Sequence, residues 1–159
     1  MKVLDLNLAL YAVNRDSPLH ERAKRWLETA LSDEEPVAIA WAVALGFVRL
    51  ATSRRVFARP LSPDQAFGVV DGWLGRPQVR LLDPGPEHWT LLKSLLTETG
   101  TAANLTTDAH LAALAIENGA TLYSTDRDFG RFQELKWVNP LEPTASDGER
   151  RGRPGRKRL

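Results

Sequence analysis

Three aspartates in this sequence lie at positions where an α/β chain brings carboxylates together. Asp108 opens an apolar stretch with helical spacing, and either Thr107 or Asp108 fits the N-terminal cap of that helix. Asp126 follows the strand-like run 121–123, and Asp5 interrupts the first apolar run of the chain. Because binding loops and helix N-termini meet at the carboxyl edge of a parallel sheet, we expect the three aspartates to face one site.

Carboxylates gathered at one edge of a sheet repel each other by several kcal/mol when they are partly buried. Either their pKa values rise or a divalent cation neutralises them. Asp5, Asp108 and Asp126 offer only oxygen ligands, and such ligands favour Mg²⁺ or Mn²⁺. Each aspartate alone fits a helix cap or an Asx turn better, but their joint spacing predicts a metal site.

The elements that must position these carboxylates alternate between short apolar runs and longer stretches of helical period. We expect strands at residues 2–7, 36–39, 79–82, 121–123 and 136–138, with helices in the segments between them. No hairpin signal separates the strands. The sequence therefore predicts an α/β fold with a central parallel sheet of about five strands and helices on both faces.

Length and composition fit one domain with a substantial core. The 159 residues are 43% hydrophobic and include no cysteine, which excludes disulfides and thiolate metal sites. Lys2, Asp5, Arg15 and Asp16 fall where an export signal would need an apolar stretch, and no run reaches the length of a membrane span. We therefore expect a soluble protein that stays in the cytoplasm.

The net charge of +1 hides an asymmetry between the body of the chain and its end. Residues 1–144 hold 15 basic and 18 acidic side chains, a net charge of −3, whereas residues 145–159 hold 6 and 2, a net charge of +4. The end of the chain is also rich in Pro, Gly, Ser and Arg. We expect one folded domain over residues 1–141 and a flexible basic tail over residues 142–159.

Three short motifs resemble those of a known family. Asp5-x-Asn7 lies on the first strand, Thr107-Asp108-Ala109 opens a helix, and Thr125-Asp126-Arg127-Asp128-Phe129 follows the next strand. Together, in this order and spacing, they resemble the PIN domain, specifically the VapC-type toxin ribonucleases. The resemblance covers residues 1–141.

This resemblance implies an endoribonuclease that depends on Mg²⁺ or Mn²⁺ and forms the toxin of a VapBC-type toxin–antitoxin pair. Asp5, Asp108 and Asp126 would be the catalytic residues and hold the metal directly or through water. The supporting residues would be Asn7 and Thr107, which would orient ligands or the phosphate, and Asp128 in the outer shell. The partners implied are an RNA substrate, a small antitoxin that blocks the site, and a second copy of the chain.

The composition adds two expectations about these partners. Residues 53–60 form a loop with three arginines and a phenylalanine, so Arg54 and Arg55 are candidates to contact RNA phosphates, with a solvated basic loop as the alternative. Large aromatic side chains also exceed what the helices around one sheet can be expected to cover, which favours a homodimer or a tight antitoxin contact. These side chains are Trp26, Trp41, Phe47, Phe57, Phe67 and Trp73.

Gly46 departs from the family pattern. PIN nucleases usually carry a glutamate early in the helix after the second strand, and here Gly46 stands at that position with no acid between Pro36 and Asp64. The glycine either allows close helix packing or marks a lost ligand, which puts a second metal in doubt. A catalytically weakened module that only binds RNA or a protein is therefore one alternative. A phosphate-handling α/β domain is another, although Asn7 stands where such a domain would need a second acid.

Two histidines and one tryptophan have simpler interpretations. We expect His20 and His88 to be solvated on helix surfaces rather than to contact metal or RNA. We expect Trp89 to point inward as part of the core.

Overall fold

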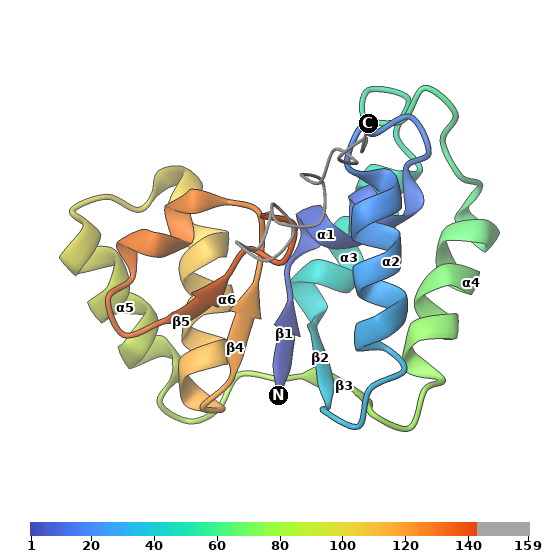
Figure 1. Ribbon diagram of the computed structural model, residues 1–159. Helices are drawn as coiled ribbons and strands as arrows, with labels where there is room; N and C mark the ends of the chain where they lie inside the picture. Colours follow the sequence, from blue (N-terminus) through green and yellow to red (C-terminus); the bar gives the residue numbers. More distant parts are fainter. Residues whose placement is uncertain (143–159) are drawn as a thin grey trace, which may run out of the picture.

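The computed structural model describes residues 1–142, which form a single five-stranded sheet of strand order β3-β2-β1-β4-β5 (Figure 1). All four strand pairs are parallel. The strands are β1 (Lys2–Leu4), β2 (Val37–Ala40), β3 (Val79–Leu82), β4 (Thr121–Tyr123) and β5 (Lys136–Val138). The predicted α/β fold with a parallel sheet is confirmed.

Strand β1 is the centre of the sheet because it pairs on both sides. Leu4 lies opposite Ile39 of β2 and Tyr123 of β4. The strand residues Val3, Ala38 and Leu122 are fully buried, as expected for a parallel sheet covered on both faces. The ends of β1 and β4 are therefore neighbours at the carboxyl edge.

The helices form two groups that cover opposite faces of the sheet (Figure 1). The chain moves outward from β1 to β3 and then returns to β4, and right-handed crossovers place the two sets of connecting helices on different faces. The first set is α1 (Leu6–Val13), α2 (His20–Ala30), α3 (Trp41–Ala51) and α4 (Pro63–Leu74). The second set is α5 (His88–Thr99), the short 3₁₀-helix η1 (Ala103–Leu105) and α6 (Thr106–Glu117).

Helix α6 is buried along most of its length between the sheet and α5. Leu111, Ala112, Ala113, Leu114 and Ala115 are all buried, so the helix is apolar on nearly every side. Gly119, with φ of +57°, follows the helix and turns the chain into β4. Because α6 precedes a strand, its N-terminus lies at the carboxyl edge of the sheet.

Two helix starts differ from the sequence-based expectation. Asp5 does not lie on a strand that reaches residue 7; instead β1 ends at Leu4, and Asp5 caps α1. Helix α6 begins at Thr106 after a turn of 3₁₀-helix, so Thr107 and Asp108 lie in its first turn and neither is the cap. The extra turn comes from local backbone bonding in η1, which composition does not reveal.

Helix α5 is rotated from the predicted orientation. Trp89 is 67% exposed and His88 is buried in its place, whereas Leu92 and Leu95 are buried as their apolar spacing predicts. The spacing of His88, Leu92 and Leu95 fits one face of a helix as well as the spacing of a face that includes Trp89. The polar bonds of His88, described below, favour the orientation that the helix adopts.

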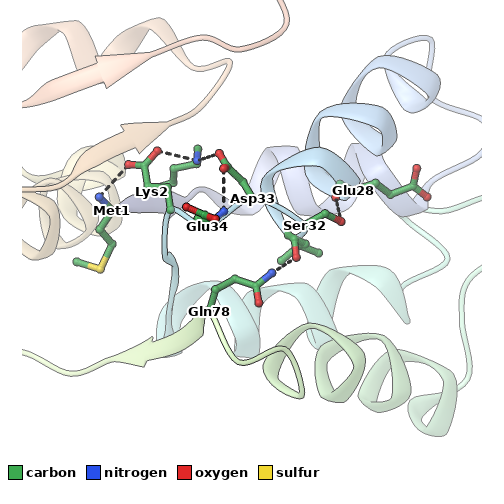
Figure 2. A network of polar contacts seen from close by, with 9 residues as sticks. Met1, Lys2, Glu28, Ser32, Asp33, Glu34 and Gln78 are labelled. Carbon is green, nitrogen blue, oxygen red and sulfur yellow. Dashed lines mark hydrogen bonds and ion pairs between the residues drawn. The ribbon is translucent and has the colours of Figure 1, made fainter.

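An ionic network fastens the amino edge of the sheet, opposite the edge that carries the aspartates. Lys2 is 8% exposed, and its Nζ contacts Asp33 Oδ2 at 2.9 Å and Glu35 Oε2 at 2.7 Å. Figure 2 shows Lys2 pointing toward Asp33 in the loop before β2. Hydrogen bonds from Lys2 lower the pKa values of Asp33 and Glu35. The network anchors β1 to the α2–β2 loop.

No helix within residues 1–142 is long and apolar enough to cross a membrane. The predicted domain, residues 1–141, falls within this part of the chain. The predicted basic tail lies outside the described residues except for Glu142.

Gly46 has a packing role in this fold. It is buried in α3 where that helix meets α1, and a Cβ atom at residue 46 would lie 2.7 Å from Leu6 Cδ2. Such an approach is too close for two carbon atoms, so the side chain of Leu6 would have to move. Gly46 therefore lets α3 pack closely against the end of the Leu6 side chain in α1.

This contact predicts that substitutions at residues 6 and 46 have non-additive effects on the free energy of unfolding. Alanine in place of glycine gains about 1 kcal/mol of helix propensity, but in the wild-type chain the displaced Leu6 offsets this gain. We expect Gly46→Ala to leave stability unchanged or lower, and to stabilise the chain by about 1 kcal/mol when Leu6→Ala is also present. Urea unfolding of the four proteins measures the coupling, and simple additivity would contradict the packing role.

Candidate active site

Asp5 is held at the carboxyl edge of β1 as the N-cap of α1. Its Oδ1 accepts a hydrogen bond from the Leu6 amide at 2.7 Å, and its Oδ2 accepts one from Ser124 Oγ at 2.6 Å. The side chain is buried, with the residue 7% exposed. Burial raises the pKa of Asp5, while the bonds from Ser124 and Leu6 favour the carboxylate and the nearby charge of Asp126 adds to the rise.

Ser124 connects the two strands that carry Asp5 and Asp126. It directly follows β4 and is fully buried. Its hydroxyl donates to Asp5 and accepts from Asn7 Nδ2 and from the Asp126 amide, both at 2.9 Å. One donor and two acceptor positions are the full capacity of a hydroxyl group, so this hydroxyl holds three residues in fixed relation.

Asp126 caps the short 3₁₀-helix η2 (Arg127–Arg131) that follows β4. Its Oδ1 accepts a hydrogen bond from the Asp128 amide at 2.9 Å. The second carboxylate oxygen has no hydrogen bond from any residue in the described part of the chain. This arrangement fixes the side chain and leaves an oxygen available to a ligand.

Asp108 reaches the same edge from the other face of the sheet. Its place in the first turn of α6 puts it at the helix N-terminus, and it is partly buried. Burial raises the pKa of Asp108 to about 6, together with the charges of Asp126, Asp5 and Asp128 in that order. The three aspartates that we expected at one site are therefore close enough for the charges of Asp5 and Asp126 to act on Asp108.

The chemistry of this group fits a hard divalent cation. The side chains supply only oxygen atoms, and their negative charges oppose one another until a cation or a proton is added. Within residues 1–142, no three His, Cys, Asp or Glu side chains already lie close enough to ligate one ion together. One shared cation would therefore require the three carboxylates to move closer together.

Of the three predicted supporting residues, Asn7 and Asp128 make hydrogen bonds within the site, and Thr107 does not. Asn7 takes part in the core of the site, because its Nδ2 binds Ser124 and its Oδ1 accepts from the Thr125 amide at 3.5 Å. Asp128 contributes its amide to Asp126 and its charge to the field at Asp108. Thr107 is exposed and its side chain makes no hydrogen bond to the described residues.

Arg54 and Arg55 are exposed in the loop between α3 and α4. They lie outside the hydrogen-bonded group of Asp5, Asn7 and Ser124. Nothing in the described part of the chain binds their side chains, so they are free for an external ligand.

Both histidine predictions were wrong, because neither side chain is simply solvated. His20 donates from Nδ1 to the Tyr11 carbonyl oxygen at 3.1 Å, with its side chain 12% exposed. His88 is buried between Glu117 Oε2, at 2.8 Å, and His110 Nδ1, at 2.9 Å. Burial and the neighbouring His88 lower the pKa of His110. The latter cluster ties α5 to α6 and so supports the helix that carries Asp108.

The sequence drew attention to Ser124 only for the phosphate-handling alternative and did not connect it with the aspartates, to which the structure joins it. The serine two residues before Asp126, at the end of a buried strand, was the only signal for it. Trp137 of β5 adds to the support by donating from Nε1 to the Ser124 carbonyl oxygen at 3.0 Å. The Ser124–Asp5 and Trp137–Ser124 hydrogen bonds both join residues that are distant in the sequence, so no local pattern indicates them.

Replacing Asp108 with Asn should change stability with a definite pH dependence. The pKa of Asp108 is raised from its ordinary value of 3.8 to about 6 in the folded chain. The contribution of this group to stability is therefore fully present below pH 3.8, where the carboxyl is protonated, and is lost as the pH rises through 6. Asp108→Asn should therefore be more stable than wild type at pH 7 without metal, by about 1 kcal/mol because solvent screens this partly exposed group. The difference should vanish near pH 4.

Thermal unfolding at pH 4 and pH 7 tests this expectation, and Mn²⁺ calorimetry on the same two proteins tests whether Asp108 is a ligand. We expect the asparagine variant to bind Mn²⁺ more weakly. Equal affinities would exclude Asp108 from the metal site.

Comparison with known proteins gives the family. The PIN domain family matches residues 2–135. Ribonuclease VapC37 of Mycobacterium tuberculosis is 47% identical over 140 residues, which cover 88% of this chain and 97% of that protein. Ribonuclease VapC33 of the same species is 43% identical over 141 residues, covering 89% and 99% of the two chains.

Solved structures share the fold at low sequence identity. VapBC2 from Rickettsia felis, bound to a DNA fragment from its promoter, has a TM-score of 0.64 at 20% identity and covers 87% of this chain and 97% of that one. VapBC-1 from nontypeable Haemophilus influenzae has a TM-score of 0.64 at 16% identity, with coverage of 89% and 98%. Together with the motifs and the parallel sheet, these matches show that the chain belongs to the PIN domain family.

Proposed function

We propose that this chain is a divalent-metal-dependent endoribonuclease and the toxin of a VapBC-type pair. The observation that carries the proposal is the electrostatic proximity of Asp5, Asp108 and Asp126 at one sheet edge, where burial first, and then the charges of Asp126 and Asp5, raise the pKa of Asp108. The ribonucleases to which the chain is 43–47% identical support the reaction type. We place the activity in the cytoplasm, where RNA is available.

In this proposal Asp5, Asp108 and Asp126 would hold Mg²⁺ or Mn²⁺. The bound cation would supply the charge that polarises the scissile phosphate and lowers the pKa of an attacking water. Asp5 has the most restricted side chain, because Ser124 and Leu6 bind its two oxygens. Asp126 offers a free oxygen beside it, and Asp108 closes the site from α6.

The remaining residues have supporting roles. Asn7 would orient Asp5 by way of Ser124, and Asp128 would orient Asp126 through its amide while its carboxylate binds water in the outer shell. Thr107, exposed beside Asp108, would donate to the phosphate. Arg54 and Arg55 would bind phosphates of the RNA strand.

We propose an antitoxin as the protein partner. The solved relatives with this fold are VapBC complexes from Rickettsia felis and Haemophilus influenzae. A partner that covers the carboxyl edge would block access to Asp5, Asp108 and Asp126 together, which gives a simple means of inhibition.

Cleavage of RNA by the purified chain tests the reaction. We expect Mg²⁺ or Mn²⁺ to support cleavage and excess EDTA to abolish it. Asp126→Asn should lower the rate by more than about 100-fold, and Ser124→Ala by about 10- to 100-fold because it only orients the ligands. Asp71→Asn, on the exposed side of α4, is the matched control and should behave as wild type.

The outcome against this proposal is also clear. If the chain binds RNA but no metal supports cleavage, the domain is a binding module rather than a nuclease. If Asp126→Asn cuts as fast as wild type, Asp126 is not part of the catalytic site. Gly46 motivates the binding-module alternative: the glycine packs closely against Leu6, but no acid stands where the family usually carries a glutamate.

We also propose a homodimer, but on the basis of one exposed apolar stripe on α3 and not of all six aromatic side chains. Phe47, Phe57 and Trp73 are buried, so half of the six aromatic side chains are covered within one chain. Trp41 and Leu45, one turn apart on α3, remain 49% and 64% exposed. Trp41 is held in place by a 3.0 Å hydrogen bond from Nε1 to Asp83. A second copy would cover this apolar stripe.

Light scattering at tens of micromolar, without antitoxin, tests the dimer. We expect wild type to have twice the mass of one chain, and Leu45→Glu to weaken association at least about tenfold by placing a charge in the contact. Phe67→Glu, at a 53% exposed position on α4, is the control and should remain dimeric. A monomeric wild type would remove this part of the proposal.

A further inference from the structure

A pocket lies at the far end of α1 from the aspartates. It has a volume of about 350 Å³, in the range of small-ligand sites, and lies between the α1–α2 loop and the α3–α4 loop. None of its lining residues belongs to the proposed metal site. The pocket is bridged at one side by an ion pair between Arg59 Nη2 and Asp16 Oδ1 at 3.0 Å.

Two side-chain amides line this pocket with fixed orientations. Asn14 Oδ1 accepts from the Asp16 amide at 3.2 Å, and Gln65 Oε1 accepts from the Ser62 amide at 2.9 Å as part of a capping box. Since each carbonyl oxygen is used by the backbone, each NH₂ group is the part left for a ligand. Within residues 1–142 neither NH₂ group donates to a protein acceptor. The pocket therefore offers two oriented donors.

The charge around the pocket is positive on a domain that is otherwise acidic. The α3–α4 loop holds Arg54, Arg55 and Arg59 and no acid, and Arg15 lines the pocket from the opposite loop. Asp16 is the one acid in the lining, and it is already paired with Arg59. Residues 1–144 carry a net charge of −3, so this local excess favours an anionic ligand.

The floor of the pocket is apolar. Val13, Phe57 and Leu61 line it, and Phe57 is only 3% exposed. A ligand that suits both parts has a flat apolar body, acceptor atoms along its edge and a negative charge. A nucleotide combines these features, since its base has faces and carbonyl or ring-nitrogen acceptors and its phosphate is anionic.

Helix α1 sets the distance between this pocket and the carboxylates. Asp5 caps its N-terminus and Asn14 its C-terminus, and eight helical residues span about 12 Å at 1.5 Å per residue. We propose that the pocket holds one nucleotide of the RNA strand, a few nucleotides from the phosphate that is cut. This inference rests on the proposed ribonuclease function and adds a specificity site to it.

Isosteric charge changes test the pocket without disturbing the fold. Gln65→Glu and Asn14→Asp each keep the oxygen that accepts the backbone amide and replace only the NH₂ donor by a second carboxylate oxygen. Glutamate also keeps the capping box of α4. Gln133→Glu, exposed in the loop after η2, makes the same charge change away from the pocket and is the matched control.

Binding is followed by NMR on the ¹⁵N-labelled full chain titrated with the four nucleoside 5′-monophosphates, and separately with inorganic phosphate. We expect nucleotides to shift the side-chain amide signals of Asn14 and Gln65 and the backbone signals of residues 57–61, more strongly than phosphate does. The double variant should bind nucleotide about tenfold more weakly, while Gln133→Glu binds as wild type. In cleavage assays the double variant should raise KM by a similar factor with little change in kcat.

Several results would overturn the inference. Unshifted Asn14 and Gln65 signals, equal nucleotide affinity in the double variant, or equal shifts with phosphate alone would each do so. Signals that respond only to added antitoxin would assign the pocket to the protein partner instead. The titration requires no catalysis, so a chain that binds nucleotide here but cuts no RNA would count against the nuclease proposal and not against the pocket.

Discussion

The Ser124 hydroxyl fixes the geometry of the carboxyl edge on which the proposed chemistry depends. It follows β4, donates to Asp5 at the end of β1, and accepts from Asn7 and from the Asp126 amide. A single buried group therefore aligns residues from two adjacent strands and from the first turn of α1. If the hydroxyl were removed, Asp5 would keep only its own helix as a partner.

The site gathers negative charge in spite of its cost to the folded chain. Burial and mutual repulsion raise the pKa values of Asp5 and Asp108, which means that the metal-free fold is less stable at neutral pH than the same packing without these charges. Two networks of polar contacts outside the site stabilise the fold against this electrostatic cost. An ionic network around Lys2 fastens the amino edge, and the buried His88 joins Glu117 and His110 behind the helix that carries Asp108.

Sequence patterns predicted the sheet well because buried parallel strands have a strong local signature. The strands at 79–82, 121–123 and 136–138 have the bounds that composition indicated. The same reasoning placed Asp5, Asp108 and Asp126 at one edge, since topology alone brings strand ends and helix N-termini there.

What the sequence did not reveal depends on contacts between distant residues. Ser124 and Asp5 are 119 positions apart, and His88 and Glu117 are 29 apart, so neither bond has a local signal. The burial of His88 in place of Trp89 accompanies the second of these bonds, which joins α5 to α6. The packing role of Gly46 likewise required the position of Leu6.

We propose above all that Asp5, Asp108 and Asp126 form one cation site. Paramagnetic broadening by substoichiometric Mn²⁺ in NMR spectra of the ¹⁵N-labelled chain tests it most directly, because broadening falls steeply with distance from the ion. We expect the amide signals of residues 5–7, 107–109 and 124–128 to broaden first and together, and Mg²⁺ to reverse the effect. Broadening confined to another acidic run, such as residues 33–35, or to one of the three segments alone, would contradict it.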